Sequence, residues 1–163
     1  FRRVLFRSGD AFPDLMVAAQ WQPVRYLRNE DGKQFVDATT EAGIAGSTGW
    51  WNSITAIDAN HDGFTDFVVG NQGRNTKYKA TTDHPLGLVF GDLDGSGKRN
   101  VVETKFEGDR LLPVRGRSCS SQAMPMLKQK FPTYEQFAGS VLGEIYPQDK
   151  LTAAGKLEAN TLD

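Results

Sequence analysis

The stretch ITAIDANHDGFTDFVVG, residues 54–70, decides how the rest of this sequence is interpreted. Oxygen-bearing side chains occupy positions 1, 3, 5 and 9 of a loop between two apolar runs: Asp58, Asn60, Asp62 and Asp66. Gly63 at position 6 permits a sharp turn, and Phe64 at position 7 offers its backbone carbonyl. Calcium takes six to eight oxygen ligands, and carboxylates this close repel one another without a cation. The spacing therefore predicts a calcium site. The alternative is a turn whose side chains cap its own backbone, which explains the alternation less well.

A second copy of the loop follows at residues 92–100, DLDGSGKRN. Its positions 1, 3, 5 and 9 are Asp92, Asp94, Ser96 and Asn100. Lys98 at position 7 contributes only its carbonyl, and Arg99 stands beside it. Calcium affinity follows the charge and rigidity of the ligands. The first loop has three carboxylates and the second has two, so we expect the Asp58 loop to bind calcium more tightly, with the Asp92 loop partly empty or structural.

A partial copy precedes both loops at residues 10–19, DAFPDLMVAA. Asp10 and Asp14 fall at its positions 5 and 9 and are candidate ligands. Its positions 1 and 3 are Phe6 and Ser8, neither of which is acidic. The Asp10 loop is therefore interpreted as a half-site.

The first eight residues, FRRVLFRS, resemble the translation of a sequencing-adapter end and are interpreted as a scar of DNA assembly. Without them the chain keeps 16 basic against 20 acidic residues, a formal charge of −4. No basic stripe remains, so nucleic acid is not an expected partner. No apolar run approaches the roughly 18 residues that span a bilayer, so no membrane insertion is expected. We expect a fragment that is open at both ends.

The residues that flank the loops distinguish between two kinds of calcium site. The Asp92 loop fits an EF-hand loosely, with Glu103 at position 12, whereas the Asp58 loop has Val69 there. An EF-hand requires helices on both sides. The flanks here are short and rich in β-branched residues: SITAI, DFVVG, GLVF and NVVET. The loops are therefore predicted to join strands.

The remaining sequence indicates a mainly β chain with an inserted helical segment. Strands are expected at residues 15–20, 24–29, 34–38, 49–57, 66–70, 86–91, 100–106 and 110–115. Residues 118–155 have helical spacing, with a capping box at residues 133–136, and are expected to pack against the β domain. Residues 156–163 are expected to begin the next strand.

The pattern D-x-[DN]-x-[DS]-G-x-x-[DN], followed by an apolar run between strands, resembles the FG-GAP or VCBS repeat of β-propellers. GWWNSITAIDANHDGFTDFVVGNQGRNTKYKA and HPLGLVFGDLDGSGKRN are similar to a subgroup that often ends in an ASPIC/UnbV module. In this family each repeat is one four-stranded blade, with the metal loop between its first two strands. The resemblance implies a partial β-propeller of two to three blades over residues 9–117, with the rest of the propeller missing. It also implies an extracellular or cell-envelope location.

The resemblance assigns Ca²⁺ as the bound ion. The ligands it implies are Asp58, Asn60, Asp62, the Phe64 carbonyl and Asp66 in one site, and Asp92, Asp94, Ser96, the Lys98 carbonyl and Asn100 in the other. Ser96 and Asn100 depart from the family pattern, in which aspartate is commoner at these positions.

No catalytic constellation is evident in the sequence, so we expect a protein that is not an enzyme. Cys119 is the only cysteine and has no histidine near it in sequence. Trp50 and Trp51 are adjacent, and at least one is expected in a core, with ligand stacking as the alternative. The expected function is a calcium-binding scaffold for a protein or glycan partner. The alternative is the accessory propeller of a secreted or cell-envelope enzyme acting on polysaccharides.

Overall fold

The computed structural model describes residues 1–7 and 9–163. The chain divides into two compact units. Unit 1 consists of Phe1–Lys79 with Ala159–Asp163, and unit 2 of Ala80–Glu158. Within the described residues twelve strands outnumber five short helices, which confirms the predicted mainly β class with a helical segment. Such a fold is consistent with a fragment of a β-propeller.

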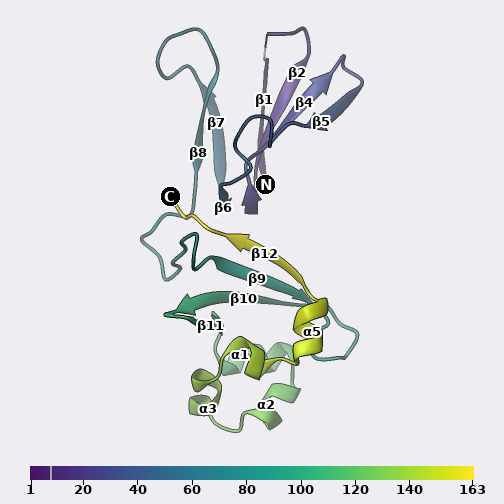
Figure 1. Ribbon diagram of the computed structural model, residues 1–163, viewed down its shortest axis with the longest axis vertical. Coiled ribbons are helices and arrows are strands. Elements are labelled where there is room, and N and C mark those ends of the chain that lie inside the picture. The colour runs from purple at the N-terminus through teal and green to yellow at the C-terminus, as the bar shows by residue number, and fades with distance from the viewer. Residues whose placement is uncertain (8) are drawn as a thin grey trace. The chain divides into compact units, whose positions relative to one another are not determined.

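Unit 1 contains a four-stranded antiparallel sheet with the order β1-β2-β4-β5 (Figure 1). Its strands are β1 (Arg2–Arg7), β2 (Pro13–Ala18), β4 (Arg25–Glu30) and β5 (Gln34–Asp37). Alternate residues of β2 are buried, including Met16 and Ala18, as expected for a strand with one face against a core. These elements lie within two residues of the predicted strands 15–20, 24–29 and 34–38.

Strand β1 lies in a segment for which the sequence analysis predicts no fold element, either present or absent. The interpretation of residues 1–8 as a scar leaves them out of the strand prediction, whereas β1 pairs with all six residues of β2. Antiparallel pairing uses backbone N–H and C=O groups, which every non-proline residue carries. The pairing therefore does not depend on the origin of the segment.

The remaining strands of unit 1 form two antiparallel pairs. They are β3 (Gln20–Pro23) with β6 (Thr48–Trp50), and β7 (Ser53–Ile57) with β8 (Asp66–Gly70). The prediction of one strand over residues 49–57 is wrong, because β6 and β7 pair with different partners. At the break, the Trp51 indole donates to the Ser47 carbonyl at 3.3 Å, and the Asn52 backbone N–H donates to the Gly70 carbonyl at 2.8 Å.

Unit 2 is built on a second four-stranded sheet with the order β11-β10-β9-β12. Its strands are β9 (Leu86–Gly91), β10 (Asn100–Glu107), β11 (Arg110–Pro113) and β12 (Gly155–Ala159), whose last residue belongs to unit 1. The predicted strand 86–91 and the predicted hairpin of the next two strands are confirmed. β12 confirms that a strand follows the helical segment.

Five helices connect β11 to β12. They are α1 (Arg117–Ala123), α2 (Met126–Lys130), α3 (Tyr134–Gly139), α4 (Leu142–Ile145) and α5 (Gln148–Ala153). The predicted capping box at α3 is present, with Thr133 and Gln136 exchanging two hydrogen bonds of 3.2 Å. Leu127 and Ile145 pack with Val89 and Val102 of the sheet in one hydrophobic core. The prediction that the helices pack on the β domain is thus confirmed for unit 2.

Candidate cation-binding loops

All three oxygen-rich loops connect adjacent antiparallel strands. The Asp10 loop joins β1 to β2, the Asp58 loop joins β7 to β8, and the Asp92 loop joins β9 to β10. The last two share one register, in which position 9 of the loop pairs with the residue before position 1. These pairs are Ile57 with Asp66, and Gly91 with Asn100. The prediction that the loops join strands, and not the helices of an EF-hand, is confirmed.

In the Asp58 loop, carboxylates accept hydrogen bonds from the loop's own backbone. Asp58 accepts from the backbone N–H of Asp62 at 3.2 Å and of Gly63 at 3.1 Å. Asp62 accepts from the Phe64 N–H and from the Asn60 amide, both at 2.8 Å. The Phe64 N–H, followed by the Asn60 side chain, lowers the pKa of Asp62. These contacts are the ones expected from the alternative interpretation, in which the side chains of the turn cap its own backbone.

The rest of the Asp58 loop is open to solvent. Asp66 accepts from the Ala59 N–H at 2.9 Å and is half-buried. The Phe64 side chain is 76% exposed, so it fills no core. Gly63 has a φ of +85°, and a side chain there would meet no atom within 4 Å. Glycine is therefore favoured at position 6 by backbone conformation and not by crowding.

The Asp92 loop contains polar atoms that are buried and unsatisfied. Asp92 Oδ2 accepts from the Gly97 N–H at 3.1 Å, while Asp92 Oδ1 is buried without a hydrogen-bond partner. Asn100 Nδ2, at position 9, is also buried without a hydrogen-bond partner. Asp94 Oδ1 accepts from the Ser96 hydroxyl at 2.6 Å, which lowers the pKa of Asp94. Two predicted ligands thus have unused hydrogen-bonding capacity inside the protein.

The Asp92 loop is also anchored to its unit. Leu93, at position 2, is 0% exposed and belongs to the core of unit 2. A Cβ added at Gly91 would lie 3.5 Å from Ala154, next to α5. A Cβ added at Gly95 would lie 3.7 Å from Cε and 3.9 Å from Nζ of Lys150 on α5. Helix α5 therefore packs along this loop and brings an ammonium group beside it.

The Asp10 loop has a different geometry. Here position 9, Asp14, pairs with Phe6, so the loop is one residue shorter than the other two and Phe6 lies within β1. Asp10 is exposed and accepts from the Phe12 N–H at 2.8 Å. Ser8, the residue at position 3, lies outside the described residues.

Asp14 has a structural role that the sequence did not reveal. Its side chain is 0% exposed. One carboxylate oxygen accepts from the Tyr26 hydroxyl at 3.0 Å and the other from the Asn29 N–H at 2.7 Å. Both partners lie on β4, so Asp14 ties β2 to β4. Its assignment as a metal ligand stays a prediction.

No group of three or more His, Cys, Asp and Glu side chains suited to a metal ion occurs among the described residues. The calcium ligands deduced from the sequence therefore stay predictions. The donors present in the Asp58 and Asp92 loops are oxygens, which suit hard cations such as calcium. In the described part of the chain, no helix combines the length and apolar character that a membrane span requires.

The comparison with known families identifies the repeat. A family model described as an FG-GAP-like repeat matches residues 8–69. Residues 8–69 are therefore similar to an FG-GAP-like repeat. The match includes the Asp10 loop and the whole Asp58 loop, and it ends one residue before the end of β8. No curated protein and no solved structure matches the chain. The match supports the FG-GAP part of the resemblance over residues 8–69. The Asp92 loop lies outside the match, and the association with ASPIC/UnbV modules stays a prediction.

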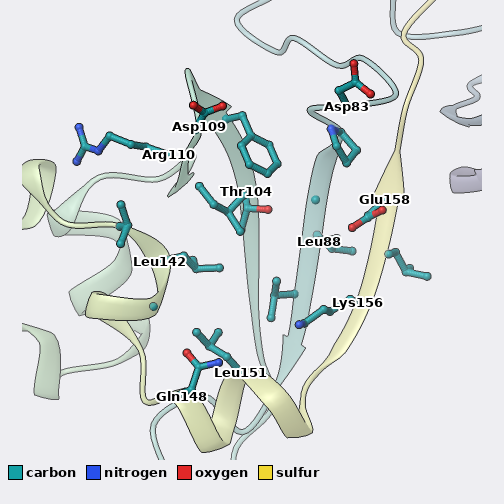
Figure 2. Close-up of a pocket in the computed structure, with 18 residues that line it drawn as sticks. Asp83, Leu88, Thr104, Asp109, Arg110, Leu142, Gln148, Leu151, Lys156 and Glu158 are labelled. Atoms are coloured by element: carbon teal, nitrogen blue, oxygen red, sulfur yellow. The ribbon is translucent and has the colours of Figure 1, made fainter.

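Unit 2 also contains a cavity that sequence patterns did not predict (Figure 2). Its lining residues run from Asp83 to Glu158. Most of them come from strands β9, β10 and β11, from helices α4 and α5, and from strand β12. No local motif brings such residues together, because their proximity depends on how the helices fold back onto the sheet.

Proposed function

We propose that the chain is a calcium-binding, non-catalytic module of the FG-GAP type that acts as a binding or scaffold unit. The observation that carries the proposal is the buried oxygen Asp92 Oδ1, which has no hydrogen-bond partner among the described residues. A buried polar atom without a partner costs about 1–3 kcal/mol. A cation ligated by this oxygen would remove that cost.

The neighbouring groups support a cation in the Asp92 loop. Asn100 presents a buried amide nitrogen that is also without a partner. Rotation of the side-chain amide exchanges its nitrogen and oxygen and would supply an acceptor in place of the donor. Asp94 and Ser96 hydrogen-bond to each other beside Asp92, so oxygen atoms from positions 3 and 5 are close together.

The Asp58 loop would hold a second calcium ion through the ligands expected from its spacing. Its carboxylates cap backbone N–H groups in this structure, so ligation would redirect them from those groups. Bound calcium would neutralise the carboxylates and rigidify the turn between two strands. Extracellular calcium modules work at dissociation constants of about 10⁻⁴–10⁻³ M, which suits a site with few charges. An extracellular or cell-envelope location, which is typical of FG-GAP repeats, is part of this proposal.

Thermal unfolding in calcium, in magnesium and in chelator tests the proposal. The two units carry separate signals, because Trp21, Trp50 and Trp51 all lie in unit 1 and the five helices all lie in unit 2. Tryptophan fluorescence therefore follows unit 1, and the helical circular dichroism signal follows unit 2. We expect calcium to raise both midpoints relative to chelator and magnesium to do so much less. No calcium-dependent shift in either signal would refute the proposed calcium binding.

A further inference from the structure

The cavity of unit 2 has the dimensions of a ligand site. Its volume is about 690 Å³, within the range of about 300–1,000 Å³ that is usual for such sites. Strands β9 and β10 contribute Val89 and Thr104, while α4 and α5 contribute Leu142 and Leu151. Strand β12 contributes Lys156, Leu157 and Glu158. All of these residues belong to unit 2, so the cavity is complete within that unit.

The walls of the cavity are mainly aliphatic. The aliphatic side chains that line it include Leu88, Val89, Leu111, Val141, Leu142, Leu151 and Leu157. Gly87 lines the cavity without a side chain, and a Cβ there would lie only 2.2 Å from the Thr104 hydroxyl oxygen. Phe106 is the only aromatic residue among the described lining residues, and its ring packs on His84 with centroids 4.8 Å apart. This surface suits aliphatic side chains and offers no free aromatic platform.

Charged side chains surround the aliphatic walls, and some of them are already committed to partners within unit 2. Asp109 lies 3.5 Å from the His84 imidazole, and Arg110 donates to the Gly139 carbonyl at 2.5 Å. In Figure 2 the Arg110 side chain extends away from the other labelled residues. The Arg110 guanidinium is therefore held by a backbone carbonyl, whereas the Asp109 carboxylate stays fully exposed beside His84.

Three other charges are left without partners. The side chains of Asp83, Lys156 and Glu158 form no hydrogen bond or ion pair with any described residue. Lys156 and Glu158 are two residues apart on β12, so they lie on the same face of that strand. Figure 2 shows both side chains extending from β12 toward the sheet, with Asp83 near the Glu158 end. The cavity thus has two free carboxylates toward one end and one free ammonium group toward the other.

We infer that this cavity binds a peptide segment of a partner protein, with aliphatic anchor residues and at least one basic residue. The inference rests on the proposed role as a binding module, and it selects a peptide over a glycan. Aliphatic anchors would cover the leucine-rich walls, because burial of apolar surface drives such docking. The basic residue would face Asp83 and Glu158, and a peptide carboxylate would face Lys156. A sugar would leave hydroxyl groups against aliphatic walls without hydrogen-bond partners.

A phage-displayed library of random dodecapeptides, selected on the full chain in calcium buffer, tests this inference. We expect the enriched sequences to combine Leu, Ile or Val with Lys or Arg. Selected peptides are then synthesised and titrated against the wild type and three variants. The double variant Lys156→Glu/Glu158→Lys reverses the local charges without changing the net charge, and Leu157→Ser removes an aliphatic side chain that is 41% exposed. Glu135→Gln is the matched control, because Glu135 is an exposed acid outside the cavity.

The expected result is that the charge-reversed variant and Leu157→Ser each bind the selected peptides about three- to ten-fold more weakly, while Glu135→Gln binds as the wild type does. All the substituted side chains are exposed, so folding should be retained, and circular dichroism checks it. The inference is overturned if no peptide is enriched, or if selected peptides bind all four proteins equally. It is also overturned if cellohexaose or self-association of the chain, but no peptide, perturbs the NMR signals of the lining residues.

The same titrations in chelator separate this inference from the proposed calcium binding. Peptide binding without any calcium effect on unfolding would retain the inference and refute the calcium sites. Calcium stabilisation without any enriched peptide would support the calcium sites and refute the inference of peptide binding.

Discussion

The Asp58 and Asp92 loops have the same spacing but are supported in different ways. The Asp58 loop has three carboxylates and is largely exposed. Its Asp58 and Asp62 side chains accept hydrogen bonds from the loop's own backbone N–H groups. The Asp92 loop has two carboxylates, with Leu93 buried in the core and α5 packed along it. It keeps a buried carboxylate oxygen without a partner. Charge count therefore favours cation binding at one loop, whereas pre-organisation favours the other.

A single position accounts for much of the difference. Position 2 is Ala59 in the first loop and Leu93 in the second. Ala59 is exposed, whereas Leu93 is fully buried, so the second loop is held by the hydrophobic core of its unit. The comparison teaches that a ligand pattern specifies which atoms are available, and that the residue between two ligands decides how firmly they are held.

The largest expected effect is on stability, from the substitution Leu93→Ala. Truncation of a buried leucine removes apolar contacts and leaves a cavity, which costs about 2–5 kcal/mol. We expect the helical circular dichroism signal of unit 2 to be lost at a clearly lower urea concentration. The matched control is Phe64→Ala in the other loop, followed by the tryptophan fluorescence of unit 1, and it should cost less than about 0.5 kcal/mol because Phe64 is exposed. Equal destabilisation by the two substitutions would contradict the difference in anchoring.

The second prediction ranks the two loops by calcium affinity. Asp62→Ala should weaken the tighter calcium-binding step by more than about ten-fold, or about 1.4 kcal/mol, because it removes one of three carboxylates. Asp94→Ala should affect only a weaker step, since its loop has fewer acids and has Lys98, Arg99 and Lys150 nearby. Calorimetric titration of calcium into each variant measures both steps. A larger loss in Asp94→Ala would show that pre-organisation outweighs charge.

The third prediction concerns the unpartnered oxygen of Asp92. In chelator, Asp92→Asn should stabilise unit 2 by about 1 kcal/mol, because a neutral amide is less costly to bury than a carboxylate. In calcium the same substitution should lower stability relative to the wild type, since it removes a charged ligand. Chemical unfolding in the two buffers measures this change of sign. Asp109→Asn, which changes a fully exposed carboxylate of the same unit, serves as the control and should change stability in chelator by less than about 0.5 kcal/mol. Destabilisation by Asp92→Asn in both buffers would argue against the cation site.

The smallest expected effect is on pH dependence. The Ser96 hydroxyl holds the pKa of Asp94 below its usual value, so folding favours the ionised carboxylate. This contribution to stability is present above about pH 4 and is lost as the pH falls through the folded-state pKa. In chelator, Ser96→Ala should raise the pKa of Asp94 toward its ordinary value, as measured by NMR titration of the side-chain carboxyl carbon. The pKa of Asp62 should not change, because the Phe64 N–H and Asn60 lower it independently. An unchanged pKa of Asp94 would exclude the Ser96 contact as its cause.

Elements built from local contacts followed from the sequence. The strands at residues 66–70 and 86–91 match the predicted bounds, and the Thr133 capping box forms as expected. Each depends on neighbours close in sequence, through β-branched runs, turn residues or side-chain capping. The strand predicted over residues 49–57 failed because its two halves have different partners. Nothing within that segment shows which partner each half will have.

The candidate functional residues also divide into those that local spacing indicates and those that depend on contacts distant in sequence. The candidate oxygen ligands of the Asp58 and Asp92 loops could be proposed from spacing, since a tight loop between paired strands brings alternate residues together. The role of Asp14 could not, because its carboxylate is buried by hydrogen bonds to β4, more than ten residues away. The cavity around Lys156 and Glu158 could not be identified either, because β12 reaches it only after five helices.

The sequence by itself therefore determined the mainly β class, the loop–strand repeats and the chemical type of their candidate ligands. These features depend on contacts between residues a few positions apart, which composition and spacing encode directly. The tertiary structure alone decided that Leu93 anchors one loop, that Asp92 has a buried oxygen without a partner, and that Asp14 joins two strands. It also assembled the aliphatic cavity. Burial and desolvation depend on segments distant in the chain, so no local pattern of residues specifies them.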